Sequence, residues 1–509
     1  MLNTDTSILE DAQVRGAIQD LLVHLGEGRI DGTPYDTAWI GRLAPLYSGF
    51  GFDEALEWLR HHQHEDGTWG TRLPYYHDRY ICTLAGMVAL KEAGTHPRDE
   101  RRVQRASDAL WHLVGRLQQD GEDTVGFPVL SVSLSEEARN YDINVPRPPI
   151  RYGNAYKSRV AKLVSNPFMN WRAHPVTFSL DGLRFAIPLI PTDAVLLEGN
   201  NSVGISPSAT AAYVMAHSNQ KAVAYLQSSL RNDNTGLVPA LFPIDIFEIA
   251  WAINHLIIAE AITPDDPEVQ RVVRVIWELW SPEKGIATSS FFTPHDVDNT
   301  IACYNILRWA GYPVSADVLY YFEGEEFFDC YPGETHHSPS AHLRIMWMLR
   351  QNGTDHPNYD KWLSKLSKAL LNFNDNGTFW WDKWHISPYY TNALALIALA
   401  GLDEELETLA RLRLTWIEKT QNDDGGWGYY GDSTPEETAF CLEGLLWWDQ
   451  HVERLAPQII RAAGQYLSNH LADQSYAPMW ISKCLYTPHY IVKSSIVSAL
   501  YSYGNWEHK

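Results

Sequence analysis

Residues 59–70 read LRHHQHEDGTWG, and residues 417–428 read IEKTQNDDGGWG. Both stretches have the same order: the end of a helix-like segment, a glutamine, an acidic turn, a glycine and then Trp-Gly. A glycine after a helix readily adopts the left-handed conformation that ends it. The glutamine amide can bond free backbone groups, and the tryptophan can pack over the junction. Two copies so far apart predict one architecture repeated in each half of the chain, with a structural role for the repeats.

The rest of the chain predicts helices almost throughout. Apolar residues recur at helical spacing in segments separated by Gly, Pro and Asn-Asp clusters, and alternating strand-like runs are scarce. The clearest segments are residues 53–59, 79–93, 246–261, 391–400, 436–448 and 459–471. Many short helices broken by tight turns predict an all-α protein in which paired helices stack into a ring or solenoid.

Composition limits the class of protein. The chain has 509 residues, of which 45% are hydrophobic, so two or three domains are expected. The formal net charge of −22 argues against nucleic acid and anionic membrane surfaces as partners. Five scattered cysteines with no C-x-x-C pair are typical of a reducing cytosol and argue against a zinc site. No apolar run has the length of a membrane span, so we expect a soluble, cytoplasmic protein with no transmembrane segment.

A second stretch carries the candidate chemistry. Residues 294–300 read PHDVDNT and lead into an apolar, helix-like run over residues 301–307. Carboxylates clustered in apolar surroundings resist ionising, so one of them can stay protonated near neutral pH. Such an acid can give its proton to a carbon–carbon double bond. The plainer interpretation is a group of helix-capping residues, which an isolated D-x-D favours; the rest of the chain favours the acid.

Taken together, these motifs resemble those of the class II terpene cyclases. The Gln…Gly-x-Trp repeats resemble the QW motifs, and DVDN at residues 296–299 resembles the D-x-D-D motif. The similarity is closest to bacterial class II diterpene cyclases, including the halimadienyl (tuberculosinyl) diphosphate synthases, and extends to the copalyl and kolavenyl diphosphate synthases. It runs nearly end to end, through residues 35–39, 77–79, 206–210, 242–248, 382–385, 389–391, 436–439 and 476–480.

The resemblance implies the fold and the reaction. The fold is a βγ didomain of two α/α-barrels, with the active site between them. We expect a β domain at residues 1–20 and 236–509, which carries the acid motif, and a γ domain inserted at residues 21–235. The reaction is the protonation-initiated cyclisation of geranylgeranyl diphosphate to a bicyclic diphosphate of the labdane, halimadane or clerodane type. The diphosphate is retained, because the D-D-x-x-D motif of ionising terpene synthases is missing.

The resemblance also assigns roles to the motif. Asp298 stands at the middle Asp of the family pattern and is the general acid, and Asp296 tunes its acidity. Asn299 replaces the fourth-position Asp. Because an amide can still orient the acid, we favour a working natural variant over a weakened enzyme or a deliberate substitution.

The family holds Mg²⁺ and the diphosphate on an acidic stretch of the γ domain, whose counterpart here contains Asp120, Glu122 and Asp123. Carboxylates are suitable ligands for a hard cation, but Pro128 replaces the usual Glu, so an exposed acidic turn is an equal alternative. Counter-charges for the diphosphate are expected from Lys157, Arg159 and Lys162, against the alternative of solvated surface residues.

The remaining candidates are groups that would face the substrate. Aromatic rings stabilise cations, although core packing is the simpler role for each ring taken alone. Many family members have a Ser-x-Ser-x-Asn-x-His motif, in which His342 stands at the Asn position and Arg344 at the His position. His342 is either the base that ends the reaction by removing a proton from the last cation or, as we favour, a structural histidine. The candidate substrate-binding residues are Trp251, Trp380, Trp384, Tyr389, Tyr390, Trp480 and His342; Tyr486 is a further candidate ring.

Several alternatives stay open. The enzyme could instead cyclise farnesyl diphosphate to a drimane. Alternatively, the protein could be a non-catalytic relative that binds an isoprenoid, with Asn299 marking the loss of activity. A carbohydrate-active α/α-barrel enzyme is disfavoured, because carboxylates two residues apart cannot flank a glycosidic bond from both sides. The product skeleton and the number of subunits, a homodimer included, are not fixed by the sequence.

Overall fold

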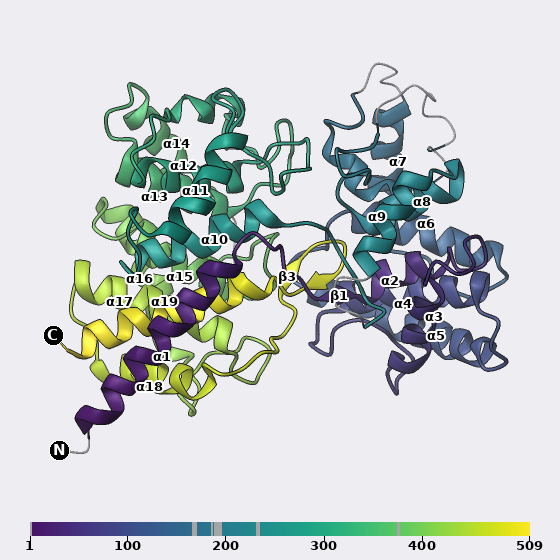
Figure 1. Cartoon of the computed structure of the whole chain (residues 1–509), viewed down its shortest axis with the longest axis horizontal. Helices are drawn as coiled ribbons and strands as arrows, with labels where there is room; N and C mark the ends of the chain where they lie inside the picture. The colour runs from purple at the N-terminus through teal and green to yellow at the C-terminus, as the bar shows by residue number, and fades with distance from the viewer. Residues whose placement is uncertain are drawn as a thin grey trace.

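Two helical bodies lie side by side in the computed structural model, with both termini on the same body (Figure 1). The structure describes residues 3–164, 170–184, 187, 196–230, 235–373 and 377–508, without the side chains of residues 3–11 and 162–164. Each body has its own large cluster of buried apolar side chains. This arrangement confirms the prediction of an all-α protein built from two α/α-barrels.

The first body is a closed double ring of helices. Its inner helices contact one another in the cyclic order α10, α12, α13, α15, α17, α19 and back to α10. Every residue of α15 is buried, as an inner helix requires, whereas α14 buries one stripe made of Trp362, Leu366, Ala369 and Leu370. The inner helices are α10 (Asp245–Ile258), α12 (Val297–Trp309), α13 (Pro339–Asn352), α15 (Pro388–Ala398), α17 (Pro435–His451) and α19 (His489–Glu507). Around them lie α1 (Asn3–His24), α11 (Pro267–Leu279), α14 (Tyr359–Asn372), α16 (Glu404–Lys419) and α18 (Pro457–His470), with a 3-10 helix η4 (Ala316–Tyr321).

The second body repeats this plan on a smaller scale. Its inner ring runs α2, α4, α6, η2, α8 and back to α2. These elements are α2 (Pro34–Gly41), α4 (Tyr76–Ala93), α6 (Phe127–Asn140), the 3-10 helix η2 (Pro175–Leu183) and α8 (Pro207–His217). Around them lie α3 (Asp53–His62), α5 (Asp99–Leu113), η1 (Val114–Gln119), α7 (Ile150–Val164) and α9 (Gln220–Leu230).

The two QW repeats make the same contacts in the two bodies. Gln63 donates to the carbonyls of Gly67 and Arg102, each at 2.9 Å, and the Trp69 indole N–H donates to the carbonyl of Leu59. In the first body, Gln421 donates to the carbonyls of Gly425 and Ile459 at 2.8 and 3.0 Å, and the Trp427 indole donates to that of Ile417. Each repeat therefore ties the end of one helix to the next helix pair, as the sequence predicted.

The chain crosses between the bodies through two short antiparallel strands, β1 (Gly32–Thr33) and β2 (Val238–Pro239). The side chain of Glu248 accepts hydrogen bonds from the backbone N–H groups of Gly26, Gly28 and Arg29, which fixes the first crossing. Residues Leu21, Leu22, Leu25 and Ile30 pack in the core of the first body. The division into residues 1–20 with 236–509 and residues 21–235 stays a prediction.

A hairpin of the first body reaches into the second. It consists of β3 (Trp480–Ile481) and β4 (Leu485–Tyr486), and it lies at the junction of the two bodies (Figure 1). Between the strands, the buried ammonium of Lys483 contacts Asp181 at 2.8 Å and the hydroxyls of Ser206 and Ser208 at 2.7 Å. Through the described part of the chain, no helix combines the length and the apolar character needed to cross a membrane.

Candidate active site

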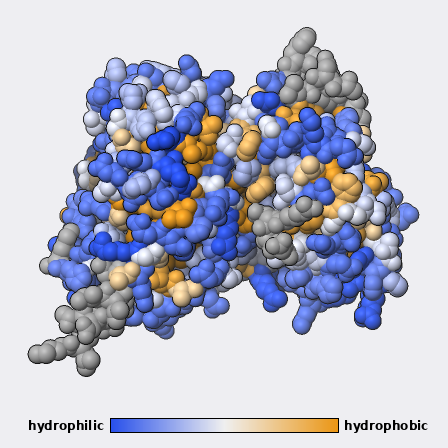
Figure 2. All heavy atoms as spheres, in the orientation of Figure 1, coloured by the Kyte–Doolittle hydropathy of each residue, from blue (hydrophilic) through white to orange (hydrophobic). Residues whose placement is uncertain are grey.

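A mostly apolar cavity, here called the central cavity, lies between the two bodies. The first body supplies residues from α10, from the start of α12 and from the β3–β4 hairpin, and the second supplies residues from η2 and from the turn before α6. Hydrophobic residues gather on both sides of the hollow between the bodies (Figure 2). The lining consists of Val125, Pro175, Phe178, Ile205, Leu241, Phe247, Trp251, Thr288, Phe292, Asp296, Asp298, Asn299, Tyr331, Trp384, Trp480, Ile481, Ser482 and Tyr486.

The DVDN motif opens α12 on the wall of this cavity. Asp296 is the N-cap, and its carboxylate accepts the backbone N–H of Asn299 at 2.8 Å. The Asn299 side-chain N–H₂ also donates to both Asp296 oxygens, at 2.9 and 3.1 Å. An Asp at position 299 could donate only in its protonated form. The carboxamide therefore supplies these hydrogen bonds at every pH, and Asp296 both caps the helix and belongs to the acid group.

Asp298 differs from Asp296 in having no nitrogen or oxygen donor for either carboxylate oxygen in the described part of the chain; the polar group beside it is the weakly donating Cys330 thiol. The residue is 5% exposed. Burial raises its pKa from 3.8 to about 6, against the opposing charge of Lys383. Burial and the charge of Asp298 raise the pKa of Asp296 to about 7. The motif thus presents a carboxyl group that is readily protonated and faces an apolar space.

Lys383 is a buried cation close to the acid group. Its ammonium donates to the carbonyl of His336 at 2.6 Å and pairs with Glu334 at 2.7 Å. It also lies 4.7 Å from the centre of the Trp384 ring. Lys383 therefore holds the segment before α13 against the wall that carries Trp384.

Aromatic rings form much of the remaining wall. Phe247 meets Trp251 edge to face with ring centres 4.6 Å apart, and Trp480 lies 5.3 Å from Phe247 and 6.3 Å from Trp251. Of the candidate residues, Trp251, Trp384 and Trp480 line the central cavity, as does Tyr486. Ring faces in a dry cavity can stabilise a positive charge that has no counter-ion.

The other candidate residues lie elsewhere. Trp380 packs under Arg413, whose guanidinium carbon is 3.9 Å from the ring centre, and Tyr389 stacks on Trp416. Both His342 ring nitrogens are used by the backbone, one with the carbonyl of Ser338 and one accepting the N–H of Phe328. Burial lowers the pKa of His342 to about 4, so the ring is neutral and structural. Tyr390 does not line the central cavity but hydrogen-bonds to Trp251, which does.

A second hollow, here called the mouth, adjoins the central cavity and shares Val125, Pro175 and Tyr331 with it. Arg159 lines the mouth together with His174 and His295. Lys157 is exposed and does not line it, and the side chain of Lys162 lies outside the described residues.

The carboxylates of the acidic turn in the second body, residues 120–123, contact histidine side chains. One Asp120 oxygen accepts the backbone N–H groups of Tyr76 and His77 and contacts the His77 ring at 2.6 Å. The other His77 nitrogen lies 3.0 Å from Asp123. Burial opposes the charged ring, but the bonds to Asp120 and Asp123 outweigh it and raise the pKa of His77.

Glu122 pairs with His336 of the first body at 3.0 Å. Within the described residues, Asp120, Glu122 and Asp123 do not converge on one point as metal ligands do; the group that converges is Asp78, Cys82 and Cys484. The three carboxylates as placed do not fit a shared Mg²⁺ ion.

Sequence reasoning missed several cavity residues. Phe292 and Tyr331 stand before and after the acid motif, and Ser482 stands two residues beyond Trp480 on the hairpin. The Ser482 hydroxyl is buried and has no partner in the described part of the chain. Closeness along the chain to Asp298 and to Trp480 could have indicated Phe292 and Ser482, but Tyr331 is too far along the chain from either for this signal. Phe178 of the second body had no such signal.

Comparison with known proteins identifies the family of the chain. The squalene-hopene cyclase C-terminal domain family matches residues 338–443. The chain is 33% identical to the type B diterpene cyclase of Mycobacterium tuberculosis, covering 94% of this chain and 96% of that protein. It is 30% identical to the ent-copalyl diphosphate synthase of a Streptomyces species, covering 96% of both.

Among solved structures, the ent-copalyl diphosphate synthase of Streptomyces platensis superposes with a TM-score of 0.78 over 97% of this chain and 99% of that one, at 24% identity. The Arabidopsis thaliana ent-copalyl diphosphate synthase gives 0.69 over 96% of this chain and 63% of that one, at 22% identity. Fold, acid motif and end-to-end similarity agree, and the chain belongs to the class II diterpene cyclases.

Proposed function

We propose that this enzyme cyclises geranylgeranyl diphosphate to a bicyclic diphosphate and leaves the diphosphate attached. The observation that carries the proposal is Asp298: a buried carboxyl group with no nitrogen or oxygen donor in the described structure, with a raised pKa, on the wall of an apolar cavity. A general acid aimed at an alkene needs this setting, because water or a basic neighbour would take the proton first.

The first step is proton transfer from Asp298 to the terminal alkene. The carbon–carbon π electrons take the proton, a tertiary cation forms at the neighbouring carbon, and Asp298 becomes a carboxylate. Asn299 fixes Asp296 through two side-chain hydrogen bonds, so that Asp296 stays beside Asp298 without competing for the alkene. These bonds support a working acid group with Asn at position 299.

The next steps are ring closures within the central cavity. Two further double bonds attack the cation in turn and give the bicyclic skeleton. Trp251, Trp384 and Trp480 line the cavity and would stabilise the moving charge, while the apolar lining would keep water away from it. The last cation loses a proton or takes up water. The shape of the cavity decides which of the labdane, halimadane or clerodane skeletons results.

The diphosphate is proposed to lie at the mouth, where Arg159, His174 and His295 are available to it. The substrate would then extend from Asp298 through the central cavity to the surface between the bodies. Magnesium, a cytoplasmic location and a homodimer stay predictions. Because Asp120, Glu122 and Asp123 do not fit one ion as placed, the proposed steps use no metal.

The test is product analysis with purified protein. Wild type and Asp298→Asn are incubated with geranylgeranyl or farnesyl diphosphate and Mg²⁺, treated with phosphatase and examined by gas chromatography–mass spectrometry. We expect a bicyclic C20 alcohol from wild type and only the linear alcohol from the variant. A bicyclic C15 alcohol alone would replace the substrate with farnesyl diphosphate, and linear alcohols throughout would favour the non-catalytic relative.

A further inference from the structure

Behind the aromatic wall of the central cavity lies a second, smaller cavity inside the first body, here called the rear cavity. It has a volume of about 20 Å³, and its lining combines the polar residues Asn254, His255, Arg344, Tyr390 and Glu443 with the apolar residues Ile258, Ala393, Leu394, Ile397 and Phe440. This volume is enough for one water molecule, provided that polar partners are present.

The lining of the rear cavity offers such partners. His255 contacts both oxygens of Glu443 at 3.2 Å through one ring nitrogen, while its other ring nitrogen is buried and unpartnered within the described residues. The Nε of Arg344 is likewise buried and has no partner there. Buried polar groups are rarely left unsatisfied, and one bound water would satisfy both atoms.

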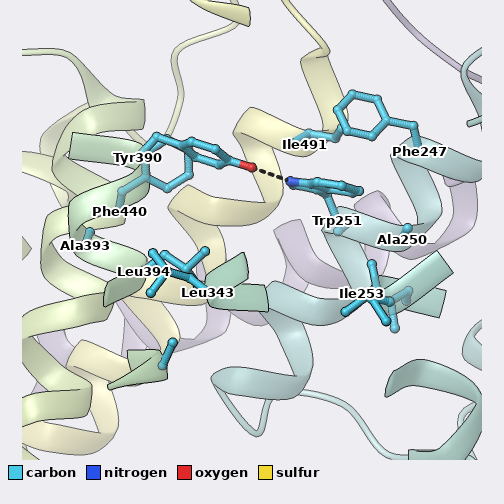
Figure 3. Packing of buried hydrophobic residues seen from close by; sticks show 14 of the residues in the cluster. Phe247, Ala250, Trp251, Ile253, Leu343, Tyr390, Ala393, Leu394, Phe440 and Ile491 are labelled. Carbon is cyan, nitrogen blue, oxygen red and sulfur yellow. Dashed lines mark hydrogen bonds between the residues drawn. The ribbon is translucent and has the colours of Figure 1, made fainter. Parts of the chain in front are cut away.

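The partition between the two cavities is a layered wall. Trp251 and Trp480 face the central cavity, whereas Tyr390 and Phe440 face the rear cavity. The Tyr390 ring lies 5.2 Å from Trp480 and 5.4 Å from Phe440. Figure 3 shows Tyr390 of α15 and Trp251 of α10 pointing toward one another across the barrel. One tyrosine ring thus fills the space between the two cavities.

Hydrogen bonds fix this wall. The Trp251 indole N–H donates to the Tyr390 oxygen at 3.2 Å, and Arg344 donates to the same oxygen at 3.0 Å. The Arg344 guanidinium also stacks over both rings, 4.6 Å from the centre of Trp251 and 5.6 Å from that of Tyr390. The three side chains hold one another in place.

We propose that Tyr390, held by Trp251 and Arg344, is a specificity-determining residue that keeps the water of the rear cavity away from the carbocation. The inference rests on the proposed function, since it concerns the fate of the cation formed there. Without the Tyr390 ring, the Trp251 N–H loses its acceptor and faces the rear cavity, and water can reach the substrate beside Trp251 and Trp480.

The chemistry of water capture balances without a further reagent. A lone pair of the water oxygen forms a bond to the cationic carbon, and the resulting oxonium gives one proton to a second water or to the Glu443 carboxylate. The product is a ring-hydroxylated or chain-hydroxylated diphosphate. No oxidant or reductant takes part.

The experiment compares wild type, Tyr390→Ala, Tyr390→Phe and Tyr466→Ala in ¹⁸O-labelled water with geranylgeranyl diphosphate. Tyr466 is a matched control, because it is a buried tyrosine on the outer helix α18 that lines neither cavity. Tyr390→Phe keeps the ring and removes the hydroxyl. Tyr390→Leu is tested beside Tyr390→Ala in case the larger truncation does not fold.

We expect the fraction of product with ¹⁸O on a carbon other than the former diphosphate carbon to rise about tenfold in Tyr390→Ala. That change corresponds to ~1.4 kcal/mol in the relative barriers to water capture and proton loss. Tyr390→Phe keeps the ring but loses the oxygen that accepts from Trp251 and Arg344, so its fraction should rise less than that of Tyr390→Ala. Tyr466→Ala should stay near wild type. An active Tyr390→Ala or Tyr390→Leu without this rise, or an equal rise in Tyr466→Ala, would overturn the inference.

A high-resolution crystal structure supplies a readout that does not depend on activity. We expect a water bonded to His255 and Arg344 in the wild-type rear cavity, and water continuous with the central cavity in Tyr390→Ala. A dry rear cavity in the wild type would overturn the inference even if the enzyme is active. A wild type without turnover but with this water would count against the proposed function and not against the partition.

Discussion

Replacing Asp298 with Asn should abolish cyclisation and at the same time stabilise the protein at neutral and alkaline pH. Asn has nearly the same shape but carries no charge, so it removes the cost of burying a carboxylate. Burial raises the pKa of Asp298 from its ordinary 3.8 to about 6 in the folded protein. A raised carboxyl pKa means that ionisation favours the unfolded chain.

The size of this effect follows from linkage. At ~1.36 kcal/mol for each tenfold change in acidity, the raised pKa corresponds to ~3 kcal/mol. The destabilisation is absent below pH 3.8, grows through the interval up to about 6, and is fully present above it. Roughly half of it should develop between pH 5 and pH 8. The advantage of Asp298→Asn over wild type should therefore increase by ~1 to 2 kcal/mol across that range.

Urea unfolding of both proteins at pH 5 and pH 8 measures this difference, with buffer and ionic strength held constant. Asn brings an unpaired amide into the cavity, which lowers stability by a similar amount at both pH values, so the change between them is the diagnostic quantity. An advantage that is the same at pH 5 and pH 8, or one that shrinks as pH rises, would refute the account of Asp298 as a buried, easily protonated carboxyl group.

Three further predictions concern rate, stability and binding. The kcat/KM for cyclisation should fall about tenfold per pH unit above about pH 6, because Asp298 must be protonated to act. Asn299→Asp adds a third carboxyl group and should therefore shift this fall in kcat/KM to higher pH. A kcat/KM that rises up to pH 8 would contradict the role of Asp298. Trp427→Ala should lower the free energy of unfolding by ~3–5 kcal/mol, which denaturant unfolding would measure. Its product profile, checked by chromatography, should be unchanged. A new product would show that the QW repeat shapes the cavity. Arg159→Ala should raise KM about tenfold, or ~1.4 kcal/mol, at similar kcat. Lys157→Ala, on the same helix but outside the lining of the mouth, should leave KM unchanged. Equal effects of the two substitutions on KM would show that Arg159 does not bind the diphosphate at the mouth.

Local sequence patterns were sufficient to predict much of the fold and the acid motif at the centre of the site. The Gln63 and Gln421 repeats could be recognised because their hydrogen bonds stay largely within one turn and the next helix. The same holds for DVDN, whose cap bonds span three residues. Such contacts depend on spacing along the chain, and spacing is what a sequence displays.

The rest depends on contacts between distant segments. Asp120 was predicted as a metal ligand, but its carboxylate is held by His77, 43 residues away along the chain. Trp380 and Tyr390 are both buried aromatic residues, ten positions apart in the sequence. Trp380 packs against Arg413, whereas Tyr390 hydrogen-bonds to Trp251, and only these distant partners distinguish the two rings. Helical periodicity shows that such a ring is buried but not which cavity, if any, it faces.

Cyclisation in deuterated water tests the central claim most directly. If Asp298 starts the reaction, its exchangeable proton becomes carbon-bound, so wild type in D₂O should give a bicyclic diphosphate with one deuterium on the ring methylene that was the terminal alkene CH. Mass spectrometry would locate the deuterium, and ³¹P NMR would show the diphosphate still attached. A bicyclic product without deuterium, or released inorganic diphosphate in equal amount to product, would contradict protonation by Asp298 as the initiating step.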